Sequence, residues 1–294
     1  MSEVLTSVLN QPGAQPRELE GQVQALLSYL QDRPSPPDAR YVALDGGSIM
    51  AAVICLDSPG RSALVFVPSM QINPHHRDVV VELLDRLLRA GRQRGVRLFH
   101  VLAPLDSPAD DHLLAVAGFD RLAELVYLER PSTLPVRATP DPAGLTWTCY
   151  DRTTHRLFAE VIQSTYEGSL DCPQLFGHRD IEDIIAGHKD AGEFDPQRWF
   201  VLRDCGRPVG CLLLARVRHR SALELVYMGL APQARGRGLG KAMLRRALQV
   251  TLQANLAYLT LAVDAANTPA CALYRRFDFA ETMRRTAWVL TPKG

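Results

Sequence analysis

The sequence predicts a mixed α/β fold that is repeated twice in tandem. Strand-like and helix-like apolar patterns alternate along the chain, which is typical of α/β and α+β domains. Four prolines among small and polar residues at 131–144 mark a linker near the middle. The chain also matches itself when it is shifted by 160 positions. We therefore expect two copies of one fold, at residues 1–130 and 145–294.

The elements of the first half follow from these patterns. A helical spacing of leucines predicts a helix from Arg17 to Asp32, which Pro34, Pro36 and Pro37 end. Apolar runs bounded by turn residues predict strands, and one-sided leucine patterns predict helices. We expect strands at 41–44, 49–56, 63–67, 98–102 and 122–129, and further helices at 78–93 and 108–117.

The second half repeats this order after the linker. We expect strands at 145–150, 199–203, 210–216, 224–228, 258–264 and 286–290, and helices at 154–166, 180–188, 241–256 and around Tyr274. The shift aligns core residues without a gap: Leu84 with Leu244, Leu88 with Leu248, Leu113 with Leu273 and Phe119 with Phe279.

Composition narrows the possible functions. A chain of 294 residues with 47% hydrophobic residues suits two packed domains. The net charge of +1 gives no electrostatic case for nucleic acid as a partner. The six cysteines include no C-x-x-C pair, which favours a reduced cytoplasmic setting. No signal peptide or long apolar run is present, so we expect no membrane span.

A glycine-rich turn lies between a predicted strand and a predicted helix. Gly236, Gly238 and Gly240 follow the strand that begins at Glu224, and Lys241 continues into the helix. Glycines at a helix N-terminus let main-chain N–H groups approach a phosphate without interference from Cβ atoms. The spacing fits neither a P-loop nor a G-x-G-x-x-G dinucleotide motif. The turn therefore predicts a phosphate site of another type.

Two motifs resemble the GNAT superfamily of N-acetyltransferases. Arg235, Gly238 and Gly240 match its Arg/Gln-x-x-Gly-x-Gly/Ala pyrophosphate loop. The segment from Asn267 to Phe279 resembles the family's Asn-x-x-Ala-x-x-Leu-Tyr-x-x-x-Gly-Phe pattern, with Ala270 and Leu273-Tyr274 in place. Asp278 replaces the glycine, and Asp tolerates the left-handed conformation required there. The resemblance implies two GNAT-like domains, each with a mixed, mainly antiparallel twisted sheet flanked by helices.

The resemblance also implies acetyl-CoA as cosubstrate and a role for each matching residue. The coenzyme-binding residues would be Met228, Gly229, Leu230, Arg235, Gly236, Arg237, Gly238, Leu239, Gly240, Lys241 and Asn267. Glu224 would be the general base for the acceptor amine, and Tyr274 would protonate the departing thiolate. The structural alternatives are an exposed strand end for Glu224, a core aromatic for Tyr274, a helix N-cap for Asn267 and solvated arginines at 235 and 237.

The acceptor side of the site is less defined. The loop that follows the first helix of the second half shapes the acceptor site in the family, and here it carries Tyr166, Glu167 and Asp171. These side chains could receive a cationic amine, or the loop could simply be solvated. The histidines lack metal-ligand spacing, so we expect no metal.

The first copy lacks the three glycines and both candidate catalytic residues. The shift places His76, Asp78 and Val80 on the three glycines and Leu64 on Glu224. Side chains in the phosphate position, one of them anionic, should prevent coenzyme binding there. Tandem GNAT proteins with one degenerate half are known, and the layout resembles that of mycothiol synthase, although no motif for a mycothiol substrate is present.

We therefore expect an acyl-CoA-dependent N-acyltransferase with one active site, in residues 145–294. It would transfer acetyl to a small-molecule or protein amine by direct attack. The alternative is a non-catalytic acyl-CoA-binding sensor or scaffold. The tandem copies could form a monomer with an internal pseudo-dimer, or the chain could be a homodimer.

Overall fold

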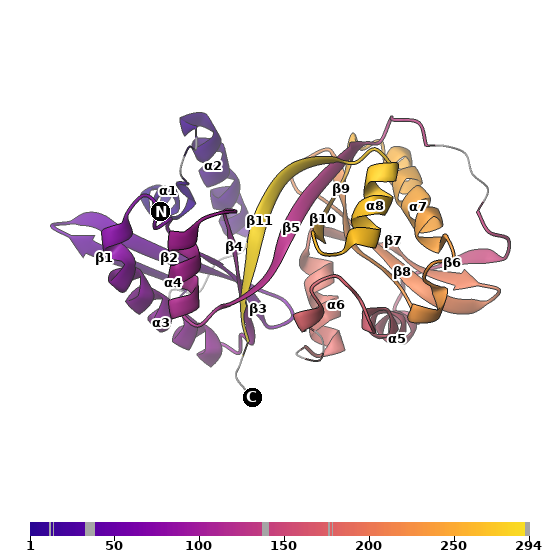
Figure 1. Cartoon of the computed structure of the whole chain (residues 1–294), viewed down its shortest axis with the longest axis horizontal. Coiled ribbons are helices and arrows are strands. Elements are labelled where there is room, and N and C mark those ends of the chain that lie inside the picture. Colours follow the sequence, from indigo (N-terminus) through magenta and orange to yellow (C-terminus); the bar gives the residue numbers. More distant parts are fainter. Residues whose placement is uncertain are drawn as a thin grey trace. The chain divides into compact units, whose positions relative to one another are not determined.

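The computed structural model describes residues 1–11, 13, 15–32, 39–136, 141–175, 177 and 179–291. Pro34, Pro36 and Pro37 lie outside the described residues, as do positions 137–140 of the predicted linker. The chain divides into two compact units: residues 1–123 with 285–294, and residues 124–284. Both units are mixed α/β structures, as predicted (Figure 1).

The first unit is a sheet with helices on both faces. Its sheet runs in the order β1-β2-β3-β4-β11, and the pairs β1–β2, β2–β3 and β4–β11 are antiparallel. The elements are α1 (Ser2–Leu9), α2 (Pro16–Asp32), β1 (Arg40–Asp45), β2 (Ser48–Ser58), β3 (Ser62–Phe66), α3 (Arg77–Gln93), β4 (Leu98–Ala103), α4 (Pro108–Val116), the start of β5 (Asp120–Pro131) and the end of β11 (Ala280–Leu290).

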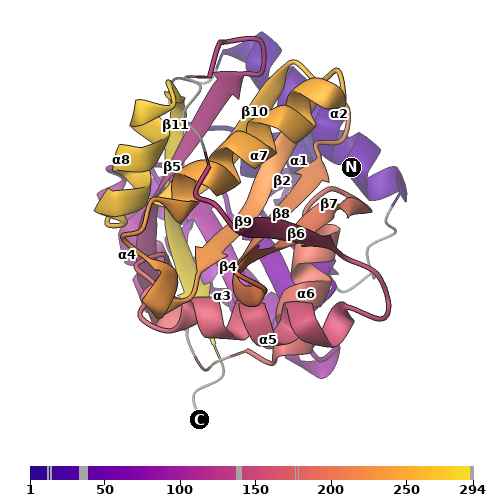
Figure 2. The ribbon, with the colours of Figure 1, turned by 90° about the vertical axis from the view of Figure 1, so that its right-hand side faces the viewer.

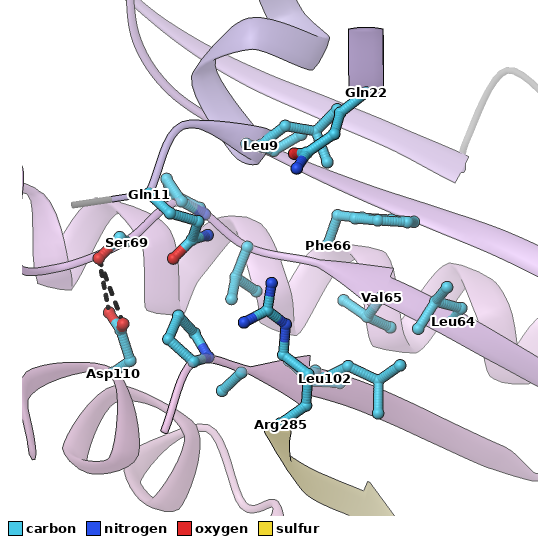
Figure 3. Close-up of a pocket in the computed structure, with 16 residues that line it drawn as sticks. Leu9, Gln11, Gln22, Leu64, Val65, Phe66, Ser69, Leu102, Asp110 and Arg285 are labelled. Carbon is cyan, nitrogen blue, oxygen red and sulfur yellow. Dashed lines mark hydrogen bonds between the residues drawn. The ribbon is translucent and has the colours of Figure 1, made fainter. Parts of the chain in front are cut away.

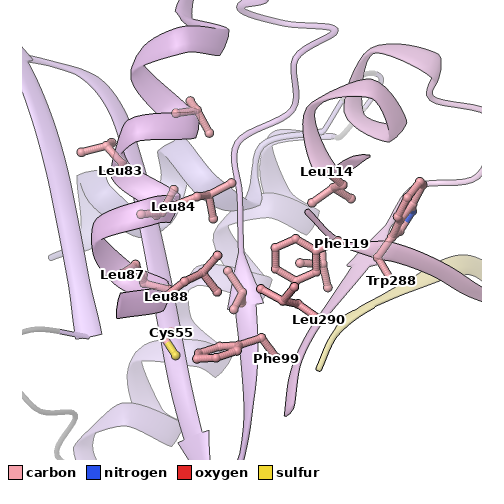
Figure 4. Close-up of a cluster of buried hydrophobic side chains, with 14 of the residues drawn as sticks. Cys55, Leu83, Leu84, Leu87, Leu88, Phe99, Leu114, Phe119, Trp288 and Leu290 are labelled. Carbon is pink, nitrogen blue, oxygen red and sulfur yellow. The ribbon is translucent and has the colours of Figure 1, made fainter. Parts of the chain in front are cut away.

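Two apolar cores hold the first unit together. Leucines of α3 and α4 pack against Phe99 on β4 and against Trp288 and Leu290 on β11 (Figure 4). On the other face, α1 and α2 cover the alternate side chains of β2, which include Ala52 and Ile54. Because both faces of β2 are buried, its sequence is a continuous apolar run rather than an alternation.

The second unit has the same plan. Its sheet runs β5-β10-β9-β8-β7-β6, and only β9–β10 is parallel among the printed pairs. Its elements are the end of β5, β6 (Leu145–Cys149), α5 (His155–Tyr166), α6 (Ile181–Asp190), β7 (Glu193–Asp204), β8 (Arg207–Arg216), β9 (Ala222–Leu230), α7 (Leu239–Gln253), β10 (Tyr258–Asp264), α8 (Thr268–Arg276) and the start of β11.

Helices cover the two faces of this second sheet. Residues of α7 and α8 form one core with β8, β9 and β10, whereas α5 and α6 form another core on the opposite face (Figure 2). Side chains of β9 alternate between these cores, with Leu223 and Leu225 towards α7. A bulge at Val226 then places Val226 and Tyr227 together on the α5 face.

The repeat predicted from the sequence is present in the structure. The strands and helices β3, β4, α4 and β5 begin at residues 62, 98, 108 and 120, and β9, β10, α8 and β11 begin at 222, 258, 268 and 280. Each start is displaced by 160 positions. The parallel pairing also repeats, with Ser62 opposite Leu98 in one unit and Ala222 opposite Tyr258 in the other. Two copies of one fold are therefore confirmed.

The last strand of each copy pairs within the other unit's sheet. Residues 286–290 of β11, at the end of the second copy, pair with β4 in the first unit. Residues 125–131 of β5, at the end of the first copy, pair with β10 in the second unit. The bounds of the compact units therefore differ from those of the predicted domains, 1–130 and 145–294. The predicted domain bounds stay a prediction.

Asp278 has the left-handed backbone expected of it. Its φ is 59°, and the equivalent residue of the first copy, Gly118, has a φ of 88°. Both follow a short helix and lead into a strand. The replacement of the family's glycine by Asp is thus accommodated without a change of backbone.

Several elements extend beyond their predicted bounds, most of all β7 and β11, of which β11 begins at Ala280 instead of 286. Strand β7 begins at Glu193, and residues 193 and 194 pair with Arg216 and Ala215 before a bulge. Pro196 and the polar residues around it hide that part of the strand from an apolar pattern. The apolar stretch near the N-terminus is a short helix, α1. No helix in the described part of the chain combines the length and apolarity needed to cross a membrane.

Candidate active site

A cavity of about 690 Å³ lies in the second unit where β9 and β10 separate. The two strands pair in parallel only through Glu224 and Thr260. Beyond that point β9 continues to Leu230 and β10 to Asp264, and residues of both strands line the cavity. The residues of β9 beyond Glu224 pair with β8 on one edge and leave the other edge open.

The open edge presents main-chain donors to the cavity. The N–H of Ala231 donates to the carbonyl of Val209, at 2.9 Å, and so points towards β8. Successive N–H groups along a strand point to opposite edges, so those of Met228 and Leu230 point into the split. Met228, Gly229 and Leu230 all line the cavity. Gly229 is required for another reason: a Cβ there would lie 2.7 Å from the Thr165 side chain of α5.

The glycine turn lines the same cavity. Gly236 and Gly238 have φ values of 73° and 79°, which strain any residue with a Cβ. Gly238 is the N-cap of α7, and the first N–H groups of a helix have no partner within it. A Cβ at either glycine would meet nothing within 4 Å, so the space in front of the turn is open. The turn is therefore shaped for an anion.

Arg235 lines the cavity, but its guanidinium donates four hydrogen bonds to main-chain carbonyls. Nε donates to Leu230 at 3.0 Å, Nη1 to Gly168 at 2.8 Å, and Nη2 to Thr165 and Glu167 at 3.0 and 2.7 Å. These bonds tie the end of α5 to the start of the glycine turn. Arg235 therefore holds the start of the glycine turn in place against the end of α5.

The other residues near the turn differ in whether they line the cavity and whether they have a partner. Arg237 does not line the cavity and pairs with Asp204, at 2.7 Å. Leu239 is buried in the core beneath α7. Lys241 and Arg276 line the cavity, are exposed, and form no ion pair with any described residue. Arg276 was missed from the sequence, because nothing distinguishes it among 33 basic residues.

Glu224 lies at the last paired position before the split. It points to the α5 face, because its neighbours Leu223 and Leu225 pack beneath α7. Burial alone raises its pKa, and no described residue forms a hydrogen bond or ion pair with its carboxyl group. Glu224 is absent from the residues that line the cavity, so it stands just behind the cavity wall.

Tyr274 is buried on α8 and lines the cavity. Its ring packs 5.6 Å from that of Phe279, and no described residue forms a hydrogen bond with its hydroxyl. Burial raises the pKa of the phenol well above its usual range, and the carboxyl of Asp171 acts in the same direction. Tyr274 therefore keeps its proton more firmly than a phenol in water and is protonated at neutral pH.

Asn267 combines the two roles expected for it. Its Oδ1 accepts the Ala270 N–H, at 3.3 Å, as the N-cap of α8. The residue also lines the cavity. Because the carboxamide oxygen caps the helix, the Nδ2 group is the part left for a ligand.

Of the three predicted acceptor residues, only Asp171 lines the cavity. Its Oδ1 accepts the Asp264 N–H at 3.0 Å, and burial together with the Asp264 carboxyl raises its pKa. Tyr166 is turned instead towards His188, with its hydroxyl 3.4 Å from Nε2. Glu167 is exposed and contributes its carbonyl to Arg235.

One cavity thus joins a glycine turn shaped for an anion, an open strand edge and a buried tyrosine. The chain belongs to the GNAT family of acetyltransferases. The model of the "Acetyltransferase (GNAT) family" matches residues 162–279, which hold the glycine turn, the split and Tyr274. The protein is an N-acetyltransferase of tandem GNAT type.

Relatives share most of the chain. A mycothiol acetyltransferase of Clavibacter michiganensis is 30% identical over 81% of this chain and 74% of its own length. One from Thermobispora bispora is 28% identical over 83% of this chain and 81% of its own. The resemblance of the tandem layout to that of mycothiol synthase, which the sequence indicated, is thus confirmed.

Solved structures show the same fold at lower identity. A GCN5-related N-acetyltransferase from Sphaerobacter thermophilus has a TM-score of 0.67 at 16% identity, over 99% of this chain and 91% of that one. A tandem GNAT protein from the clavulanic acid biosynthesis pathway has a TM-score of 0.52 at 15% identity, over 100% of this chain and 94% of that one.

Proposed function

We propose that the chain transfers an acetyl group from acetyl-CoA to a primary amine by direct attack while both substrates are bound. The supporting observation is one cavity that joins the glycine turn, the open edge of β9 and Tyr274. When bound, acetyl-CoA supplies the activated acyl group as a thioester. Holding two reactants together in a productive geometry contributes about 7–11 kcal/mol in well-oriented systems.

The chain holds the donor mainly through its backbone. N–H groups of residues 236–240 converge at the N-terminus of α7 and suit a diphosphate. Lys241 and Arg276 add positive charge at the same cavity. The N–H groups of Met228 and Leu230 face the split, where they would bind the pantetheine arm and stabilise the oxyanion that forms on the acyl carbonyl.

Glu224 would take the proton from the acceptor amine. Because its carboxyl stands behind the cavity wall, the proton would move through a bridging water. Its raised pKa brings the base closer to the working pH, as general-base catalysis favours. Asp171, which lines the cavity, would hold the amine in its cationic form before deprotonation.

Tyr274 would protonate the departing thiolate. The phenol has a proton to give at any working pH, because burial raises its pKa. A thiol of ordinary pKa, about 8.5, is a fair leaving group, so this step needs only modest help. In this scheme, Glu224 accepts one proton from the acceptor amine and Tyr274 donates one proton to the thiolate.

The acceptor is proposed from chemistry and from relatives. A cavity with Asp171 at its wall suits a cationic amine. The two relatives are named mycothiol acetyltransferases, so an acceptor amine of the mycothiol type is the first to test. Polyamines, aminoglycosides, amino acids and protein N-termini form the comparison panel.

The test combines calorimetry with a thiol-release assay. We expect the purified chain to bind acetyl-CoA and to release free thiol only when an accepted amine is added. Binding without amine-dependent release across the panel would favour a non-catalytic acyl-CoA sensor. Absence of any heat of association with CoA or its thioesters would remove the proposal.

A further inference from the structure

Tyr227 lines the catalytic cavity but takes part in no step of the proposed reaction. The bulge in β9 turns its side chain to the α5 face, where its Oη lies 2.9 Å from Thr165 Oγ1. The Thr165 hydroxyl has one hydrogen and donates it to the Ile162 carbonyl, at 2.7 Å, so Tyr227 is the donor in this pair. The hydrogen bond therefore fixes where the end of the Tyr227 ring lies.

Two further rings support Tyr227. His188 of α6 stacks on it, with ring centroids 5.3 Å apart and 29° between the planes, and the Tyr166 ring packs at 5.3 Å. Burial lowers the pKa of His188 to about 4, so the stacked imidazole is uncharged at neutral pH. Neither His188 nor Tyr166 is among the residues that line the cavity. Tyr227 is thus a wall of the cavity with closely packed rings behind it.

This wall lies beside the donors proposed for the acyl carbonyl. A Cβ at Gly229 would lie 2.8 Å from Tyr227 Oη and 2.7 Å from the Thr165 side chain. Gly229 lies between Met228 and Leu230, whose N–H groups point into the split. The hydroxyl end of Tyr227 therefore covers β9 at the position where the thioester would bind.

The acyl group of a bound donor has to end on this face of the sheet. The glycine turn opens α7, which covers one face, whereas Glu224 points to the α5 face. A donor with its diphosphate at the turn and its thioester near Glu224 passes through the split. Its acyl group then meets the wall that Tyr227 and Thr165 form.

At the equivalent split of the first unit, where β3 and β4 separate, a serine replaces the glycine. In the shift of 160 positions, Ser69 takes the place of Gly229. The Ser69 hydroxyl donates to the carboxyl of Asp110 (Figure 3). This carboxyl also accepts the Ser107 hydroxyl and, at 2.5 Å, the Met70 N–H. Side chains at this point of the repeat therefore close one split and leave the other open.

We propose that Tyr227 limits the length of the acyl chain and so selects acetyl-CoA over longer acyl-CoA thioesters. The inference rests on the proposed function, because it needs an acyl donor in the split. The ring is fixed by Thr165 and backed by His188, and packed side chains do not make room for extra methylene groups without a cost. The cavity on this face otherwise extends towards Asp171, where the acceptor amine would bind.

The test compares acetyl-CoA with butyryl-CoA, which has two more methylene groups, by isothermal titration calorimetry on the full chain. Wild type should bind butyryl-CoA no more tightly than acetyl-CoA. Tyr227→Leu removes the ring and opens an apolar space. The ratio of the two Kd values should therefore shift about tenfold in favour of butyryl-CoA.

Two control variants show whether the shift belongs to the ring of Tyr227. Tyr227→Phe keeps the ring and loses only the hydrogen bond to Thr165, so the Kd ratio should stay within about threefold of wild type. Phe158→Leu shortens a fully buried ring of the same core that does not line the cavity, and it should also leave the ratio unchanged. Equal shifts in Tyr227→Leu and Phe158→Leu would overturn the proposal.

Wild type alone also tests the proposal, whether or not a variant folds. Butyryl-CoA that binds wild type about tenfold more tightly than acetyl-CoA would contradict a wall at Tyr227. So would folded Tyr227→Leu with the wild-type ratio. Wild type that binds neither thioester would instead remove the proposed function, and this inference with it, so the two failures are distinguished by the acetyl-CoA titration.

Discussion

Each unit contains a split between two parallel strands at the same position of the repeat, and different side chains line the two splits. In the second unit, Glu224 stands at the fork and glycines open α7 to an anion. In the first unit, Leu64 stands at the fork and Asp110 binds the equivalent edge amide. The pairing register is the same in both. A fold can therefore keep its framework while a few side chains decide whether the split between its strands is open or closed.

The largest expected effect comes from removing the carboxyl at the fork. Glu224→Gln should lower turnover about 100-fold at neutral pH, because general-base catalysis is lost. The loss should shrink at high pH, where the amine is already neutral. Steady-state rates from pH 6 to 10 measure this. The same profile in both proteins would remove Glu224 from the base role.

The same variant should gain stability. Burial raises the pKa of Glu224 in the folded state, so the ionised carboxyl destabilises the fold above that pKa, and stability rises as the pH falls through it towards the unfolded value. Glu224→Gln should therefore unfold at a higher urea concentration than wild type at pH 7, and the difference should narrow in acid.

The next effect tests the closed split of the first unit. Asp110→Ala should lower the free energy of unfolding by about 2–3 kcal/mol, because it leaves the Met70 N–H and two buried hydroxyls without an acceptor. Asp85→Ala, on the exposed face of α3, is the control and should cost at most about 0.5 kcal/mol. Urea titration compares the two. Equal effects would mean that Asp110 does not hold the split closed.

A smaller effect isolates the glycine turn. Gly238→Ala and Gly206→Ala impose the same strain, since both glycines have φ near 80° and open space around the Cβ position. Both should lose about 1–2 kcal/mol of stability. Only Gly238→Ala should weaken acetyl-CoA binding, by about tenfold. Calorimetry measures the affinity, and matching losses in both variants would assign the effect to strain alone.

The smallest effect concerns the phenol. Tyr274→Phe should lower kcat about tenfold or less and leave the Kd for acetyl-CoA unchanged, because thiolate is a fair leaving group. The raised pKa of Tyr274 also predicts that wild-type activity does not fall through its ionisation up to pH 10. A kcat equal to that of wild type would assign Tyr274 to the core.

The sequence predicted what local patterns encode. Strand and helix order, the left-handed Asp278 and the glycine turn each depend on residues near one another in the chain, and the repeat is the same series of local patterns 160 positions later. The role of the Arg235 side chain depends on main-chain carbonyls more than 60 residues away in the sequence. No local sequence pattern predicts these contacts. The position of Glu224 behind the cavity wall likewise depends on which strands diverge, and where.

The pairing of each copy's last strand within the other unit also could not be predicted from the sequence. The apolar run at 287–290 predicts a strand but does not identify its partner, because β4 and β10 both pair with an antiparallel neighbour. Each copy's last strand fits either sheet by its pattern. The choice is made by long-range packing, such as that of Trp288 and Leu290 in the first unit's core.

That exchange sets an order for biosynthesis. Synthesis delivers β4 and its first neighbour β3 long before the second neighbour of β4, which arrives only with residues 286–290. Until then the edge of β4 has open hydrogen-bonding groups, the kind of surface that pairs with other chains. Nascent chains of this protein should therefore need protection at this edge until residues 286–290 have emerged.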